Sequence, residues 1–248
     1  NVAKGRSALY TNTTSDHNTS LGYYALYTNT GGSNTAIGSN ALAANTTANN
    51  LTAVGFDALG DNTTGGTATA IGFQALANHT TGHYNTGVGY NALYAATTTQ
   101  SCTAVGKDCL QAVTTGSSNS ALGTSAGYAI TTGTQNTAIG FEALKSNTDA
   151  SFSTAVGSQS LENSTGNSNT AVGAFALQLT TTGTANTAVG REALVSNTTG
   201  QKNIAVGIYS LDGNTTGNYN VGVGSGALGG NTTASANTAV GHSALQSN

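Results

Sequence analysis

The chain has 248 residues and carries little charge, with 6 basic and 9 acidic side chains and a net charge of −3 at pH 7. No cluster of basic residues exists to follow a phosphate backbone, which argues against nucleic-acid binding. No run of 18 apolar residues occurs, so the sequence predicts no membrane-spanning helix.

One motif recurs along the whole chain at an almost constant spacing. We number each copy so that N-T-A-V-G takes positions 1–5, A-L takes 8–9 and N-T-T-G takes 12–15, and we call the nth copy coil n. The position 5 glycine falls at residues 5, 22, 38, 55, 72, 89, 106, 123, 140, 157, 173, 190, 207, 224 and 241. Twelve of the fourteen intervals are 17 residues and two are 16, which gives fifteen copies. A period this constant predicts a repeat array.

The first copy starts at position 1 with Asn1, and the last stops at position 12 with Asn248. Terminal repeats of solenoids normally carry capping features with a polar outer face, and neither end shows one. We therefore expect residues 1–248 to form a single β-solenoid repeat array and to be a segment of a longer fibre protein.

Each copy predicts two short strands and two turns. Thr and Val favour strands whereas Gly and Asn favour turns, so positions 2–4 are expected to form a strand that ends at the position 5 glycine. A second short strand is expected at Ala8 and Leu9, before N-T-T-G turns the chain again. The predicted fold is all-β: a parallel β-solenoid, or β-roll, of about fifteen 17-residue coils. Asparagines at positions 1 and 12 are expected to stack and to hydrogen-bond along the axis.

Positions 3 and 4 point to opposite faces of the first strand. Position 4 is Val, Ile or Leu in every copy except the first, which has Lys4, so we expect it to face the core. Position 3, which is Ala, Ser or Gly throughout, would then form an outer strip that suits close approach of identical chains. The alternative is that position 3 lies inside and is small because the coil is narrow. The residues expected at a subunit interface are Ala36, Ala53, Ala70, Ala104, Ala138, Ala155, Ala171 and Ala188.

The motif N-T-A-V-G-x-x-A-L-x-x-N-T-T-G, complete at 186–200, resembles the repeats of bacterial and phage tail-fibre-domain proteins. It is also similar to the YadA-like head of trimeric autotransporter adhesins, whose coils are shorter. The resemblance covers essentially the whole chain. It implies an extracellular homotrimeric fibre, in a virion tail fibre or on a bacterial surface, that supports attachment to a host or surface and brings no catalytic residues.

Positions 6 and 7 vary most between the copies and hold many of the charged and aromatic residues. A variable corner on a constant scaffold is where binding specificity usually lies. We therefore expect any contact with a cell-surface glycan or receptor at this corner. The candidate contact residues are Tyr23, Tyr24, Tyr90, Arg191, Glu192 and Tyr209.

The acidic residues are candidates for the catalytic pair of a glycan-cleaving tailspike. Such an enzyme needs two carboxyl groups about 5–9.5 Å apart. Glu142 and Glu192 would lie three coils, about 14 Å, apart at the usual strand spacing. Asp57 and Asp61 are the nearest pair in the sequence. The sequence places no pair of carboxyl groups in an apolar setting that would raise a pKa, so we predict no enzyme and no catalytic residues.

No cofactor or metal ion is predicted. Cys102 and Cys109 stand at positions 1 and 8 of coil 7, and the sequence leaves open a disulfide across the coil or buried free thiols. His79 and His83 are close in sequence but have no third ligand nearby, which argues against a metal site.

An ice-binding solenoid is the alternative function. Threonine recurs at position 13 and usually at position 14, as in Thr198 and Thr199. Adjacent residues of a strand point to opposite faces, so these two cannot form a flat array of the T-x-T kind. The sequence therefore favours a structural fibre or adhesin segment.

Overall fold

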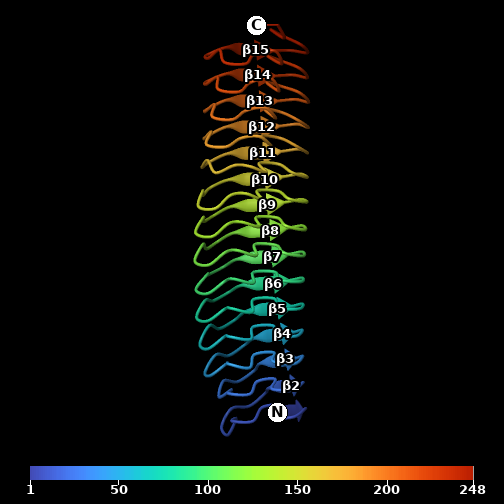
Figure 1. Cartoon of the computed structure of the whole chain (residues 1–248), viewed down its shortest axis with the longest axis vertical. Helices are drawn as coiled ribbons and strands as arrows, with labels where there is room; N and C mark the ends of the chain where they lie inside the picture. Colours follow the sequence, from blue (N-terminus) through green and yellow to red (C-terminus); the bar gives the residue numbers. More distant parts are fainter. Residues whose placement is uncertain (248) are drawn as a thin grey trace. The chain divides into compact units, whose positions relative to one another are not determined.

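The computed structural model describes residues 1–247 and is all-β (Figure 1). That part of the chain contains fifteen strands of three residues each and no helix, and hence no helix long and apolar enough to cross a membrane. The strands are β1 (Val2–Lys4), β2 (Thr19–Leu21), β3 (Thr35–Ile37), β4 (Thr52–Val54), β5 (Thr69–Ile71), β6 (Thr86–Val88), β7 (Thr103–Val105), β8 (Ser120–Leu122), β9 (Thr137–Ile139), β10 (Thr154–Val156), β11 (Thr170–Val172), β12 (Thr187–Val189), β13 (Ile204–Val206), β14 (Val221–Val223) and β15 (Thr238–Val240).

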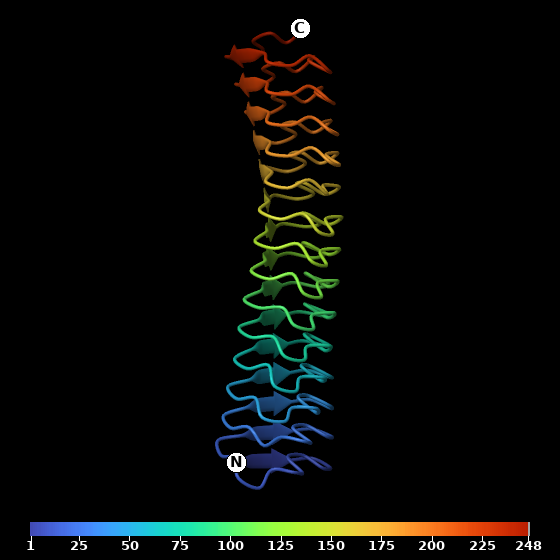
Figure 2. The same cartoon turned by 90° about the vertical axis from the view of Figure 1, so that its left-hand side faces the viewer.

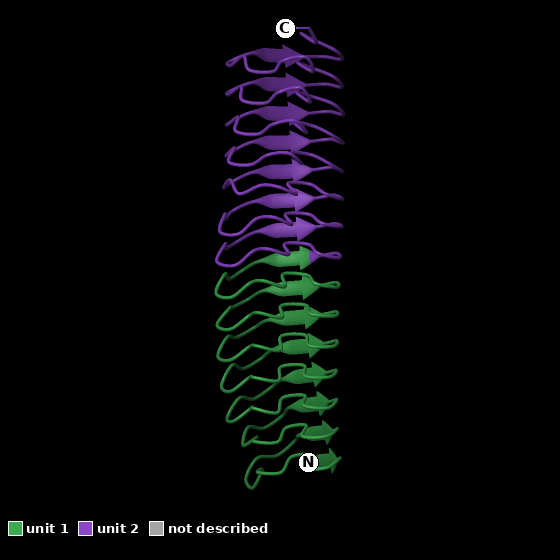
Figure 3. Cartoon of the chain, viewed as in Figure 1, with its two compact units in different colours: residues 1–121 green, residues 122–248 purple. Residues whose placement is uncertain are grey.

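The chain forms two compact units, Asn1–Ala121 and Leu122–Asn248 (Figure 3). In unit 1 the strands β1 to β7 pair in sequence order, parallel and in register, so that equivalent repeat positions lie side by side. In unit 2 the strands β9 to β15 do the same. Within each unit the strands stack one above another in sequence order, joined by turns (Figure 2). The predicted parallel β-solenoid with a repeat of about 17 residues is confirmed, whereas the single array within a longer fibre stays a prediction.

The two 16-residue coils keep the strand register. Coil 2 lacks one residue of the N-T-T-G turn and reads Asn29-Thr30-Gly31, and coil 10 reads Ser164-Thr165-Gly166. Thr19 still pairs with Thr35, and Thr154 with Thr170. The corner at positions 13–15 therefore absorbs the change in length.

The second predicted strand is absent, because the backbone at positions 6–11 forms turns instead. Glycine at position 5 has φ between 127° and 148° in all fifteen copies, and a Cβ on Gly190 would lie 2.5 Å from the carbonyl oxygen of Gly207. Positions 7 and 9 are left-handed, with φ of 57° at Glu192 and 52° at Leu194. This alternation turns N–H groups toward both neighbouring coils: Glu192 donates to Ala174, and Leu194 donates to Ser210. The prediction of a strand at positions 8–9 is therefore wrong.

The apolar core is formed by positions 3, 8 and 9. Leu194 at position 9 and Ala193 at position 8 are fully buried. Position 3 is also buried, which contradicts the expected outer strip, while position 4 is partly exposed, 38% at Val189. If the strand faced the other way, the β-branched side chains at positions 2 and 4 would both point inward. The coil is too narrow to take both, so the small residue at position 3 points inward instead. The eight alanines expected at a subunit interface are at most 1% exposed and belong to the core: Ala36, Ala53, Ala70, Ala104, Ala138, Ala155, Ala171 and Ala188.

Buried asparagines at positions 1 and 12 occupy much of the remaining interior, where some coils carry apolar residues such as Leu51 and Ile130 instead. The side-chain amide of Asn186, at position 1, donates to the carbonyl of Gly200 at 2.8 Å within its own coil, and its Oδ1 accepts the N–H of Asn203 in the next coil at 2.9 Å. At position 12, Asn197 donates to the same carbonyl of Gly200 at 3.1 Å, and Asn214 donates to Asn197 Oδ1 at 3.0 Å. The predicted stacking of amides along the axis is confirmed.

Threonine hydroxyls at position 13 also link successive coils. Thr46 Oγ1 donates to the carbonyl of Thr63 at 2.9 Å, and Thr198 Oγ1 donates to the carbonyl of Thr215 at 3.0 Å. These hydroxyls are therefore engaged with the backbone of the next coil.

His79 replaces asparagine at position 12 of coil 5 and is fully buried. Its Nδ1 lies 2.9 Å from Asn62 Oδ1, and its Nε2 lies 3.1 Å from Asn85 Nδ2. The Asn85 amide is fixed because its Oδ1 accepts the N–H of Cys102. The imidazole therefore donates through Nδ1–H and accepts at Nε2, which requires the neutral ring. Burial, with a smaller contribution from His83, lowers the pKa of His79 to about 4.

The inside–outside assignment predicts opposite responses at neighbouring residues. Ala155→Leu should overfill the coil and lower the free energy of unfolding by about 1–3 kcal/mol. Val156→Leu should change it by less than about 0.5 kcal/mol, because that side chain lies on the outer face, where coils 2 and 8 already carry leucine. Urea denaturation of both variants measures this, and the reverse order of stability would contradict the assignment.

The buried imidazole predicts an acid-sensitive unit 1. Between pH 6.5 and about 4 the unfolded state binds a proton at His79 that the folded state does not. The stability that this residue contributes is complete above pH 6.5 and falls by up to about 3 kcal/mol as the pH drops to 4.

Urea denaturation at pH 7.5 and 4.5 measures the effect. His79→Asn, which restores the residue found in coils 3 and 4, should remove most of this pH dependence. His83→Asn is the matched control, because position 16 is partly exposed and carries Asn49 two coils earlier in the 17-residue register. Equal pH dependence in the parent and in His79→Asn would contradict the assignment.

Candidate functional site

The six residues predicted to contact a receptor all reach the surface. At position 6, Tyr23 is 44% and Tyr90 49% exposed, and Arg191 is also exposed. The position 7 residues Tyr24, Glu192 and Tyr209 are half-buried. The predicted corner is therefore accessible, and its role in binding stays a prediction.

In unit 1 the position 6 aromatic rings form a column. Phe56 stacks on Phe73 with ring centroids 5.2 Å apart, and Phe73 stacks on Tyr90 at 5.2 Å. Each inner face is covered by the neighbouring ring, so the column presents ring edges to solvent. Stacking of a sugar on the face of Phe73 is excluded by this arrangement.

In unit 2 three of the predicted contact residues lie together. The Arg191 guanidinium lies over the Tyr209 ring, 5.1 Å from its centroid, and donates to the Tyr209 hydroxyl. Arg191 Nε is 3.1 Å from a carboxylate oxygen of Glu192. The charge of Arg191 is therefore already engaged by an acid and by an aromatic ring.

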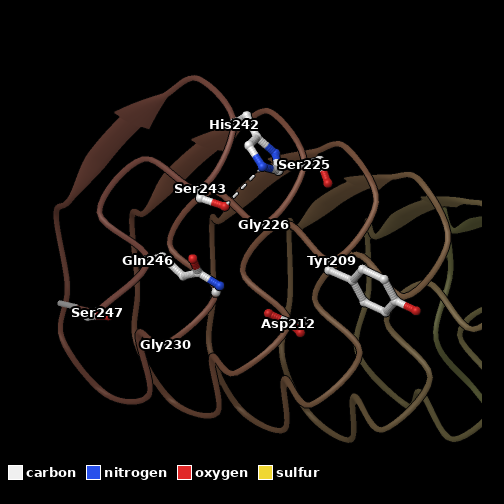
Figure 4. A pocket seen from close by; sticks show the side chains of 10 residues that line it. Tyr209, Asp212, Ser225, Gly226, Gly230, His242, Ser243, Gln246 and Ser247 are labelled. Carbon is white, nitrogen blue, oxygen red and sulfur yellow. Dashed lines mark hydrogen bonds between the residues drawn. The ribbon is translucent and has the colours of Figure 1, made fainter.

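A surface notch of about 640 Å³ lies at coils 13 to 15 (Figure 4). We call it the unit 2 notch. Coil 13 contributes an aromatic ring and a carboxylate, coil 14 contributes small residues, and coil 15 contributes polar side chains. Its lining residues are Tyr209, Asp212, Ser225, Gly226, Gly229, Gly230, His242, Ser243, Gln246 and Ser247.

Missing side chains in coil 14 create the unit 2 notch. Gly226 has φ of 65°, but Tyr209, at the same repeat position, has φ of 57°, so this backbone does not require glycine. A Cβ on Gly226 would meet only the Ser243 hydroxyl, at 3.5 Å. A Cβ on Gly229 would lie 3.0 Å from a carboxylate oxygen of Asp212. These glycines keep the carboxylate and the space beside it open.

Unit 1 contains a second notch, of about 420 Å³, at the same repeat positions. We call it the unit 1 notch. Aromatic residues come from coil 2, small residues from coil 3 and carboxylates from coil 4. Its lining residues are Tyr24, Tyr27, Thr28, Asn40, Ala43, Ala44, Asp57, Gly60 and Asp61.

Both notches combine position 7, where receptor contacts are expected, with positions 10 and 11, for which the sequence predicts no role in binding. The available signal was the pair of adjacent small residues at positions 10 and 11, Ala43-Ala44 in coil 3 and Gly229-Gly230 in coil 14. Because position 9 is left-handed, the chain folds back there and brings position 10 beside position 7. Ala43 N–H donates to the carbonyl of Asn40 across this turn.

The carboxylates of the notches are partly withdrawn from solvent. Burial raises the pKa of Asp212 and of Asp57, and nearby Asp61 adds to the rise at Asp57. Gln74 donates to Asp57 at 3.3 Å and opposes the rise. Another acid considered for catalysis, Glu142, is paired with Lys145, whose Nζ lies 2.6 Å away. The absence of enzymatic activity stays a prediction.

Both cysteines are buried free thiols, which decides between the two alternatives left open by the sequence. Burial raises the pKa of Cys109 to about 12 and also raises that of Cys102, so neither is a reactive thiolate at neutral pH. Within residues 1–247 no group of three His, Cys, Asp or Glu side chains is placed to hold a metal ion.

Comparison with known proteins adds no assignment. No family model matches the chain, and no curated protein matches it. The resemblance to tail-fibre and YadA-like repeats therefore rests on the repeat motif alone and stays a prediction.

Proposed function

We propose that this chain is a structural segment of an extracellular fibre, built from identical copies, that supports attachment of a phage tail fibre or bacterial surface appendage. The observation that carries the proposal is the outer face of the strands in each unit. Threonine at position 2 and Val, Ile or Leu at position 4 face outward together in nearly every coil.

The outer strand face is more apolar than a solvated sheet face. Exposed fractions at position 4 are 44% at Leu21 and 41% at Ile71 in unit 1, and 38% at Ile139 and Val206 in unit 2. Sheet faces in water usually carry polar or charged side chains, whereas a continuous apolar surface marks an interaction site. Lys4 is the one charged side chain at positions 2 and 4 of the sequence.

A second copy of this chain suits the outer strand face best. The same residue types recur on every strand, so parallel copies in the same register would meet equivalent side chains along their whole contact. Closed cyclic symmetry is the usual form of such assemblies, and the repeat resemblance implies three copies. We therefore propose the same homotrimer as the sequence predicts, but with a subunit interface formed by positions 2 and 4 instead of the buried position 3.

Association would supplement a thin core. Covering the exposed part of one Val or Ile is worth on the order of 0.5–1 kcal/mol by apolar area. Over the seven strands β9 to β15 this amounts to several kcal/mol, comparable with the net stability of a domain.

Ice binding is the second candidate, favoured by one observation. Position 2 threonines form an in-register row on the same outer face, as in Thr170 and Thr187. Within residues 1–247 their hydroxyls make no hydrogen bond to protein, unlike those at position 13. A thermal-hysteresis assay of the intact chain tests this candidate, and no hysteresis would reject it.

Charges on the outer strand face should separate the copies. The triple variant Ile139→Lys, Val172→Lys and Val206→Lys should yield folded monomers, because each lysine would be buried without a partner in the assembly. Sedimentation equilibrium measures the mass, and circular dichroism checks the fold.

The matched control places the same charges elsewhere. Thr182→Lys, Thr199→Lys and Thr216→Lys alter the exposed position 14, where coil 9 already carries Asp149, and should leave the assembly intact. A parent chain that is a stable folded monomer, or equal dissociation of both triple variants, would reject assembly through this face.

A further inference from the structure

The two notches share one construction although they lie in different units. In each, a tyrosine at position 7 and an aspartate border a stretch of small residues in the adjoining coil. In the unit 2 notch these are Tyr209, Asp212 and the glycines of coil 14. In the unit 1 notch Tyr24 and Asp57 stand on either side of Ala43 and Ala44.

The polar groups of the unit 2 notch converge from two coils. In Figure 4 the Gln246 side chain points into the space beside Gly226, Asp212 lies at its base, and His242 and Ser225 lie along its upper edge. The Ser243 hydroxyl is 3.5 Å from His242 Nε2. The notch thus offers a carboxylate acceptor together with amide and hydroxyl groups that both donate and accept. Tyr209 adds an apolar ring at the edge.

A sugar residue matches this set of groups. Its closely spaced hydroxyls need both donors and acceptors, and its C–H groups pack against aromatic carbon. An inorganic anion does not match, because each notch contains carboxylate and no lysine or arginine lines either one. Arg191, the cation nearest to Tyr209, is paired with Glu192.

The charge of the notches selects among sugars. Partly buried Asp212 and Asp57 lack a cationic partner among their lining residues, so they repel the carboxylate of an acidic sugar and favour a neutral or amino-bearing one. Position 7 has the same left-handed backbone with or without a side chain, so chain geometry alone does not explain Gly226.

We infer that the two notches are saccharide sites, each of which takes one neutral or amino-bearing sugar residue of a surface glycan. The inference rests on the proposed attachment function and assigns it to positions 7, 10 and 11. Two sites per chain, repeated over several copies, would turn weak single contacts into firm attachment through multivalency.

Closing both notches tests the inference. Gly226→Asn and Ala43→Gln place in each notch a residue that other coils carry at the same position, Asn91 and Gln178, so the fold should be kept. On an array of neutral, amino-bearing and acidic glycans, we expect the parent to bind the first two classes. The double variant should bind them at least tenfold more weakly, since hydrogen bonds to a partly buried carboxylate are lost.

Two further variants sharpen the result. Asp212→Asn keeps the shape but removes the charge, so it should weaken binding of amino-bearing glycans more than that of neutral ones. Gly66→Asn, at position 16 and outside both notches, adds the same side chain without effect on binding.

Each outcome decides the inference. A parent that binds only acidic glycans, or none, overturns it, and so does unchanged binding by the double variant. Failure of the fibre proposal is distinct, because it appears as a monomeric parent in sedimentation whatever the array shows.

Discussion

The asparagine amide at position 1, present in eleven of the fifteen coils, is the interaction on which most coils depend. A coil of 16 or 17 residues encloses only a small apolar core, and backbone groups at its corners are also buried away from water. Asn186 satisfies two of them, the carbonyl of Gly200 in its own coil and the N–H of Asn203 in the next. A buried backbone group left without a partner costs about 1–3 kcal/mol. The amide therefore closes one coil and positions the next one.

Much of the fold could be predicted because the repeat constrains it repeatedly. The period indicated the coil, Thr and Val indicated the strand at positions 2–4, and the recurrence of Asn186 and its equivalents indicated stacked amides. The inside–outside assignment of positions 3 and 4 failed because apolar residues occupy both faces of that strand. In a wide core hydrophobicity decides which side chain is buried, but in this narrow coil size decides it, and Ala188 goes inside while Val189 stays out.

The second strand failed for a different reason. Leucine and glutamate rarely adopt positive φ, so nothing in Glu192 or Leu194 indicates a left-handed backbone. Here every coil repeats the conformation, and hydrogen bonds to both neighbouring coils stabilise it. The same turn brings position 10 beside position 7, which explains why the two notches could not be located from the sequence. A notch also depends on comparing neighbouring coils, since Gly226 matters only because Tyr209 and Ser243 adjoin it.

The preserved register across the shortened coils has an evolutionary consequence. In coils 2 and 10 the lost residue comes from the N-T-T-G corner, while the pairing of the strands is unchanged. The strand and its glycine therefore keep their place in the repeat, whereas the corner accommodates the loss of a residue. Because equivalent positions pair in register, the gain or loss of a whole coil would leave the pairing of the other coils intact. A protein built from such repeats can therefore change its number of coils in one genetic step and then diversify individual corners by point mutation.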